Sequence, residues 1–139
     1  LLILQREFAD RLVASVGTED YGWLTVLTHY HAEVELSEKV PKSAFYPQPK
    51  VDSIITCLIP RKHKPFVLEN EAAFRRIVQS LFTQRNRKVR NAVLPYLKGT
   101  CALPKEKAAR NAETLPFHDK RVRELTPENF GALANAIVY

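Results

Sequence analysis

The spacing of apolar residues changes at residues 61–65, and this change limits the chain to a sheet-containing part followed by a helical part. Before it, Val34 and Leu36 alternate with charged or polar residues, a period of two that is typical of a half-exposed strand. After it, apolar residues recur three and four positions apart, as on one face of a helix. The segment between them is basic and contains proline, which is typical of a domain boundary. We therefore expect an α/β unit over residues 1–60 and an all-α unit over residues 61–139.

The first unit should begin with a strand and two helices. Residues 1–4 are all apolar, which predicts a buried parallel strand because both of its faces would be covered. A helix should follow it and stop near Gly17. Residues 21–31 mix helix and strand propensities, and we predict a helix there. Its inward face would carry Leu24, Leu27 and either Tyr30 or His31.

Two further strands should form an antiparallel pair at the edge of the sheet. The first covers residues 33–40 and ends at Pro41. The second covers residues 51–59, is rich in β-branched side chains and is closed by Pro60. A loop would join them.

The second unit should contain three helices. The first would bury a face formed by Phe74, Ile77, Val78, Leu81 and Phe82. The next would be one helix over residues 87–98, stopped by Gly99. The last would begin with Thr126 as its N-cap and Pro127 in its first turn, and would run as far as Val138.

Positive charge is concentrated in the middle of the chain. The chain as a whole carries +6, but residues 61–110 alone carry thirteen Lys and Arg against three Asp and Glu. A polyanion such as RNA would bind this basic part of the chain through the release of counterions. A solvated basic surface that only confers solubility is the alternative.

Several classes of protein are not supported by the sequence. No apolar run approaches the roughly 20 residues needed to cross a bilayer, so we expect a soluble, cytoplasmic protein with no membrane partner. Cys57 and Cys101 are far apart and have no clustered histidines, which argues against a metal site or a disulfide framework. Only four glycines are present, and none forms a phosphate-binding loop. Because the chain begins at Leu1 within an apolar strand pattern, we expect it to be part of a longer protein.

The first candidate binding site is the proline-rich loop over residues 44–53. Its prolines restrict the backbone and exclude a helix just before a strand. Phe45 and Tyr46 could stack on an unpaired base, with Lys50 near a phosphate. Alternatively, Phe45 could simply fill the core beside the strand.

The second candidate is the basic run over residues 84–91. If this run were helical, Arg87 would lie one turn from Arg90, so several cations would share a face. Guanidinium and amide groups bind phosphate and 2′-hydroxyl groups well. We therefore predict that the run contacts RNA through Arg85, Arg87, Lys88, Arg90 and Asn91.

Two other segments superficially match the Asn-x-Pro-aromatic motif by which amino-group methyltransferases hold a base. That motif needs Asn two positions before Pro, whereas Asn91 is four positions before Pro95. Residues 115–117 have Thr114 at the required position. We therefore interpret both segments as turns or helix ends.

Five stretches of the chain, in order, resemble the ribosomal RNA small-subunit adenine dimethyltransferases. They are residues 4–12 (LQREFADRL), 21–26 (YGWLTV), 40–53 (VPKSAFYPQPKVDS), 82–92 (FTQRNRKVRNA) and 123–130 (RELTPENF). The resemblance runs almost from end to end. It implies the C-terminal part of a Rossmann-like class I methyltransferase sheet followed by a small helical domain that binds rRNA.

The resemblance also implies a function for the longer protein. That protein would transfer methyl groups from S-adenosylmethionine to two adjacent adenosines of small-subunit rRNA, as a monomer acting on a precursor of the small ribosomal subunit. By matching motif, Phe45 resembles the aromatic residue that stacks on the extruded adenine. The family's cofactor loop and Asn-x-Pro-aromatic motif would precede Leu1, so this chain alone should neither bind cofactor nor catalyse.

Two departures from the family pattern and two alternative functions remain open. Trp23 stands where the family usually has arginine, and Asn86 interrupts a pair of basic residues. The protein could instead be a non-catalytic RNA-binding assembly factor. It could also be a methyltransferase that acts on an adenine of large-subunit rRNA.

Overall fold

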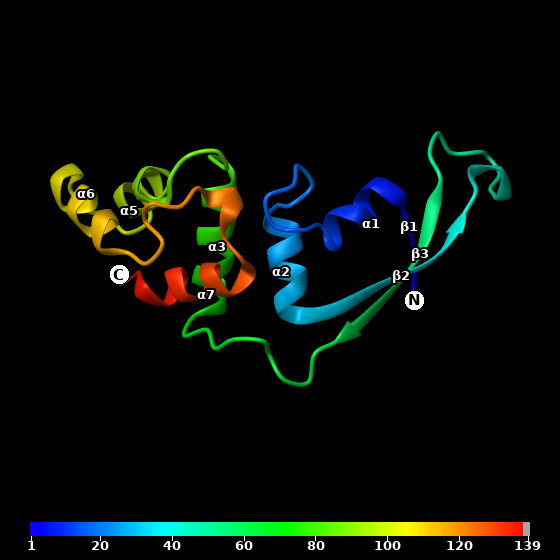
Figure 1. Ribbon diagram of the computed structural model, residues 1–139, viewed down its shortest axis with the longest axis horizontal. Coiled ribbons are helices and arrows are strands. Elements are labelled where there is room, and N and C mark those ends of the chain that lie inside the picture. Colours follow the sequence, from blue (N-terminus) through cyan, green and yellow to red (C-terminus); the bar gives the residue numbers. More distant parts are fainter. Residues whose placement is uncertain (138–139) are drawn as a thin grey trace. The chain divides into compact units, whose positions relative to one another are not determined.

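The computed structural model describes residues 1–137, which form two compact units (Figure 1). The first unit comprises Leu1–Ser15 and Glu19–Lys64. The second comprises the residues from Pro65 onward together with Val16–Thr18, a short piece of loop from the first part of the chain. The sheet belongs to the first unit, and the second unit is helical.

A three-stranded antiparallel sheet forms the centre of the first unit. Its strands are β1 (Leu2–Gln5), β2 (Ala32–Val40) and β3 (Ser53–Pro60), in the spatial order β1-β3-β2. Figure 1 shows β2 and β3 running alongside each other toward the loop that joins them. The predicted antiparallel pair is therefore confirmed.

The prediction that the first strand is buried and parallel is wrong. Its strand neighbour among residues 1–137 is β3, which runs antiparallel to it, with Leu2 opposite Thr56. Leu2 and Ile3 are 46% and 58% exposed. The apolar run marks a strand correctly, but within residues 1–137 β1 is an edge strand and these two side chains are not covered.

Two helices follow the first strand, as predicted, but their details differ. Helix α1 (Arg6–Leu12) ends well before Gly17, which lies in the loop with a φ of +88°. Helix α2 (Trp23–His31) confirms the choice of helix over strand. A short loop that includes Gly17 connects them.

The inward face of α2 matches the prediction at Tyr30 but not at the two leucines. Thr25, Val26 and Tyr30 are buried, whereas Leu24 and Leu27 are only half-buried. Thr25 is tolerated there because its hydroxyl donates a hydrogen bond to the carbonyl of Arg11 at the end of α1. A buried hydroxyl with a partner costs little, so this polar residue can occupy a core position.

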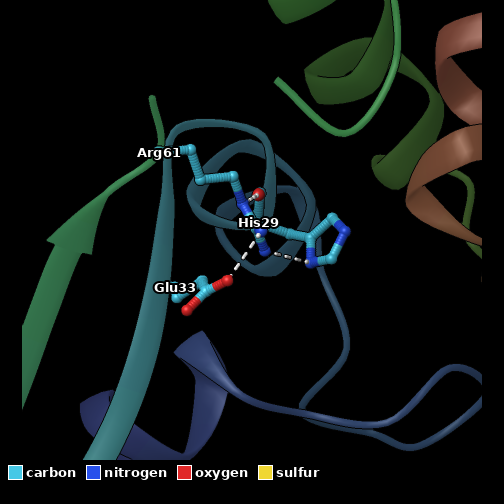
Figure 2. A network of polar contacts seen from close by, with 3 residues as sticks. All are labelled: His29, Glu33 and Arg61. Carbon is cyan, nitrogen blue, oxygen red and sulfur yellow. Dashed lines mark hydrogen bonds and ion pairs between the residues drawn. The ribbon is translucent and has the colours of Figure 1, made fainter. Parts of the chain in front are cut away.

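Arg61, which directly follows β3, is hydrogen-bonded to the C-terminal end of α2 (Figure 2). Its Nε donates to the carbonyl of His29 at 2.7 Å, and its Nη1 lies 3.3 Å from Oε1 of Glu33. The backbone N–H of Arg61 donates to the carbonyl of His31 at 3.0 Å. A guanidinium at a helix C-terminus satisfies carbonyls that have no partner within the helix and interacts favourably with the helix dipole.

The helical unit is built around two capped helices, α3 (Glu71–Phe82) and α7 (Pro127–Ala136). Asn70 accepts a hydrogen bond from the first turn of α3, and Thr126 does the same for α7, as its predicted N-cap role requires. Both predicted helices are confirmed. The expected extension of the last helix to Val138 lies outside the described residues.

The single helix expected over residues 87–98 is wrong, because two short helices occupy this stretch. They are α4 (Val89–Ala92) and α5 (Leu94–Gly99). Pro95 explains the break, since proline has no N–H to donate to the carbonyl of Asn91 and its ring would clash with that carbonyl in a continuous helix. Gly99 is the last residue of α5, close to the predicted stop.

The sequence pattern gave no prediction for helix α6 (Lys105–Thr114). Its buried residues are Ala108 and Ala112, whose small side chains give little hydrophobic periodicity. Two short 3-10 helices complete the described structure, η1 (Lys42–Ala44) and η2 (Val122–Glu124). None of the helices within residues 1–137 is long and apolar enough to cross a membrane.

Candidate nucleic-acid interface

The side chain of Asp52, at the end of the loop between β2 and β3, bonds to residues at the beginning of that loop. One carboxylate oxygen accepts a hydrogen bond from the backbone N–H of Lys42 at 2.8 Å, and the other lies 3.0 Å from Nζ of Lys39. The backbone carbonyl of Asp52 also accepts a hydrogen bond from the N–H of Arg6 at the start of α1. The Lys42 N–H and then the Lys39 ammonium lower the pKa of Asp52 below its usual value.

The predicted residues of this loop are accessible. Tyr46 is fully exposed, Lys50 is exposed, and Phe45 is half-exposed at the end of η1. The peptide bond between Tyr46 and Pro47 is cis. Phe45 is therefore not fully buried in its unit, and its stacking on a base stays a prediction.

The basic run over residues 84–91 begins in a turn and not in a helix. The N–H of Gln84 donates to the carbonyl of Leu81, and the N–H of Arg87 donates to the carbonyl of Gln84. Arg85 and Arg87 therefore precede α4, and the predicted sharing of a helix face by Arg87 and Arg90 is wrong. The break at Pro95 and the turn after α3 leave only four residues for α4.

A distant segment is hydrogen-bonded to this turn, which the sequence did not predict. The N–H of Val122 donates to the carbonyl of Arg87, and the N–H of Arg123 donates to the carbonyl of Arg85, both at 3.0 Å. Lys88 and Arg121 form an isolated antiparallel bridge. We call the resulting group the basic cluster; its members are Arg85, Arg87, Lys88, Arg90, Lys120, Arg121 and Arg123.

Three members of the basic cluster were therefore missed. These are Lys120, Arg121 and Arg123. They lie in a part of the chain whose acidic and basic residues nearly balance, so the net charge of that part does not indicate a basic site. The short run KRVR over residues 120–123 was the signal that could have identified them.

Some cations of the cluster are held in place by partners, and others are exposed. Arg90 pairs with Asp119, and Arg85 donates to the carbonyl of Thr18 at 2.8 Å. Arg121 donates to the carbonyl of Asn86. Arg87, Lys120 and Arg123 are exposed to solvent, Arg121 is exposed in spite of its bond to Asn86, and Asn91 is exposed on α4.

The turn itself forms an open hollow of about 440 Å³. Residues 83–87 line it, and they include three uncharged polar residues and two arginines. An open, cationic surface of this kind suits a phosphodiester backbone better than a small apolar ligand, which needs an enclosed pocket.

Neither a glycine-rich turn after β1 nor a metal-holding group of side chains is found within residues 1–137. The turn from β1 into α1 contains Gln5 and Arg6 but no glycine, so its backbone cannot approach a ligand as a glycine-rich loop does. No group of three His, Cys, Asp or Glu within residues 1–137 could hold a metal ion. Cys57 and Cys101 are free, and burial raises the pKa of the Cys101 thiol.

Comparison with known sequences identifies one family. The model of the family described as ribosomal RNA adenine dimethylase matches residues 1–118. The probable ribosomal RNA small subunit methyltransferase A of Methanosarcina acetivorans is 40% identical over 137 residues, which are 99% of this chain and 50% of that protein. The ribosomal RNA small subunit methyltransferase A of a Geobacillus species is 39% identical, over 99% of this chain and 47% of that protein. The chain thus spans about half the length of the curated relatives it matches.

Comparison with solved structures gives a consistent result. A dimethyladenosine transferase from Plasmodium falciparum superimposes with a TM-score of 0.77 at 27% identity, over 95% of this chain and 54% of that chain. The 23S rRNA methyltransferase ErmE superimposes with a TM-score of 0.53 at 28% identity, over 96% of this chain and 52% of that chain. The arrangement of a small sheet and helices is therefore one that methyltransferase structures contain.

Proposed function

Since the chain belongs to the ribosomal RNA adenine dimethylase family, we propose that it is the RNA-handling part of an rRNA adenine dimethyltransferase. The whole protein transfers methyl groups from S-adenosylmethionine to the exocyclic amines of two adjacent adenosines of small-subunit rRNA. The first unit supplies part of the methyltransferase domain, and the helical unit binds rRNA. The whole protein acts in the cytoplasm as a monomer, on a particle that contains small-subunit rRNA.

The observation that carries this proposal is the basic cluster. Backbone hydrogen bonds join the α3–α4 turn to residues 120–123, so cations from two distant segments of the chain lie close together without a ligand. Like charges held this close repel one another unless an anion compensates them. RNA phosphates would provide that compensation, and preformed positions reduce the entropy lost on binding.

The loop between β2 and β3 contributes the second contact in this proposal. Phe45 stacks on the target adenine when that base is extruded, and Tyr46 and Lys50 contact the RNA beside it. The half-exposed ring of Phe45 and the tethering of both loop ends by Asp52 support these roles. Stacking requires a ring that does not move away, and the tethered loop limits its motion.

RNA binding by the chain tests the proposal directly. The variant Arg87→Gln/Lys88→Gln should weaken binding to a small-subunit rRNA fragment and make it less dependent on salt. The slope of log affinity against log salt should fall by roughly 0.7–0.9 for each phosphate that the variant no longer neutralises. Equal affinities and slopes for the variant and the unchanged chain would refute the proposal.

A matched control removes the same charge elsewhere in the helical unit. Lys105 and Lys107 lie exposed on α6, outside the basic cluster. The variant Lys105→Gln/Lys107→Gln should retain more affinity than the cluster variant if the cluster binds RNA directly, whereas equal losses would indicate a general effect of net charge.

The substrate of the whole protein requires a separate assay, because the similarity to ErmE favours large-subunit rRNA as a second candidate. The longer protein, with S-adenosylmethionine, should methylate adenosines in isolated small-subunit particles. Mass spectrometry of the digested rRNA would identify dimethyladenosine. Methylation of large-subunit rRNA alone would overturn the proposed substrate.

A further inference from the structure

Phe117 occupies a turn with an unusual backbone conformation. It follows α6 and has a φ of +61°, in the left-handed region that favours glycine. A bulky side chain is unfavourable there because its Cβ approaches the neighbouring carbonyl oxygen. Such conformations persist only when surrounding contacts enforce them, and they are concentrated at sites that bind or react.

Backbone hydrogen bonds fix this turn to the basic cluster. The N–H of Lys120 donates to the carbonyl of Phe117 at 3.0 Å, which closes the turn. The N–H of Arg90 donates to the carbonyl of His118 at 3.1 Å, and the N–H of Val89 donates to the carbonyl of Lys120 at 2.8 Å. The first residues of α4 therefore hold the turn in place, and Phe117 has a defined position next to the cations.

The ring of Phe117 is only half-buried, although Leu115, two residues earlier, is 3% exposed and packs in the core. The ammonium of Lys120 lies 5.8 Å from the centre of the ring. The ion pair of Arg90 with Asp119 belongs to the same turn and helix. The ring of Phe117 is thus not fully buried, and it lies beside the ammonium of Lys120 in a turn that also contains the ion pair of Arg90 with Asp119.

This combination matches the way proteins bind single-stranded nucleic acid. Bases that are not paired stack on aromatic rings, while lysine and arginine contact the phosphates beside them. A paired duplex offers only its backbone to such a surface, because its bases are already stacked. An aromatic residue inside a cationic site therefore favours RNA with an unpaired nucleotide.

We propose that Phe117 is a base-stacking residue of the basic cluster and that the helical unit binds an unpaired nucleotide of its RNA. Lys120 contacts the phosphate of that nucleotide. This inference rests on the proposed binding of RNA by the basic cluster, and it adds a preference for an unpaired segment. The site lies in the helical unit and is separate from the loop that carries Phe45.

Two RNA probes distinguish base stacking from electrostatic attraction of the RNA phosphate backbone. One is an unstructured RNA of about ten nucleotides, and the other is a fully paired RNA of similar charge. The variant Phe117→Leu should lose roughly five- to a hundredfold in affinity for the unstructured RNA and change little toward the paired RNA. The variant Phe117→Tyr should bind both probes as the unchanged chain does.

A second measurement does not depend on affinity. The chain has one tryptophan, Trp23, so the variant Trp23→Phe/Phe117→Trp carries a single tryptophan at the proposed stacking position. Its fluorescence should be quenched by the unstructured RNA and much less by the paired RNA. For the affinity measurements, Phe82→Leu is the control for loss of an aromatic ring, since Phe82 is a half-buried ring that packs on Phe130.

The outcomes are distinguishable. Equal losses on both probes for Phe117→Leu, no loss on either, or no quenching at position 117 would each overturn the stacking role. If Arg87→Gln/Lys88→Gln left binding to both probes unchanged, the proposed RNA surface itself would fail. Retained quenching at position 117 would support the stacking role even if Phe117→Leu failed to fold.

Discussion

Gly131 lies in helix α7 at a point where another side chain comes unusually close to the backbone. A Cβ atom at this position would lie 2.5 Å and 2.6 Å from two carbons of the Phe66 ring and 3.3 Å from a third. Phe66 also meets the ring of Phe74 edge-on, with centroids 5.8 Å apart. The substitution Gly131→Ala would therefore force the Phe66 ring to move and weaken its packing on Phe74.

The size of the effect follows from two opposing contributions. Alanine in place of glycine inside a helix stabilises it by up to about 1 kcal/mol. Overpacking costs about 1–3 kcal/mol, and disrupting an aromatic pair costs about 0.5–1.5 kcal/mol. Phe66 is half-buried and can yield partly, so the lower end of these costs applies. We expect a net destabilisation of about 0.5–1 kcal/mol, and a fall in the Tm of the helical unit of roughly 2–8 °C.

Urea or thermal denaturation of a double-mutant cycle measures this effect. Gly131→Ala should destabilise the chain when Phe66 is present and should be neutral or stabilising in the Phe66→Leu background. Ala132→Gly, at the adjacent exposed position of α7, is the control for helix propensity and should cost about 1 kcal/mol in either background. An increase in stability for Gly131→Ala with Phe66 in place would refute the close approach.

Three further predictions concern the interactions that hold each unit together. Thr126→Ala should destabilise the helical unit by about 1 kcal/mol in urea denaturation, because it removes the N-cap of α7, whereas Thr126→Ser should not. The pKa of Asp52 is lowered in the folded state, so the ionised carboxylate stabilises the fold fully above the usual pKa of aspartate, and this stabilisation is lost as the pH falls through the lower, folded-state pKa. Asp52→Asn should abolish this contribution to the acid dependence of unfolding. Arg61→Met should lower the Tm of the first unit, since the carbonyl of His29 loses its guanidinium donor, and unchanged melting would contradict the role assigned to Arg61.

The elements predicted from the sequence were those with strong local signals. The helix over Phe74 to Phe82 has a regular apolar face, and the N-cap and proline at Thr126 and Pro127 mark the start of the last helix. The β2–β3 pair shows both alternation and β-branched residues. In each case, residues adjacent in sequence determine the structure, so a local pattern is sufficient.

The wrong predictions arose where a local pattern fits two structures or where tertiary contacts decide. Pro95 was visible in the sequence, yet the apolar spacing on both sides of it suggested a continuous helix. The inward face of α2 depends on the bond between the Thr25 hydroxyl and the carbonyl of Arg11, which no spacing reveals. Helix α6 packs through alanines, whose hydrophobic signal is too weak to predict it.

The basic cluster shows why the candidate interface could be predicted only in part. Four of its cations lie in one run and follow from charge alone, but the other three lie about thirty residues away and depend on hydrogen bonds such as that from Val122 to Arg87. Those bonds also set what the site can bind. A run of cations on a flexible segment attracts any polyanion, whereas cations and the Phe117 ring held by one backbone framework can favour an unpaired nucleotide over a duplex. The selectivity that we propose therefore depends on the hydrogen bonds between the two segments and not on the total charge.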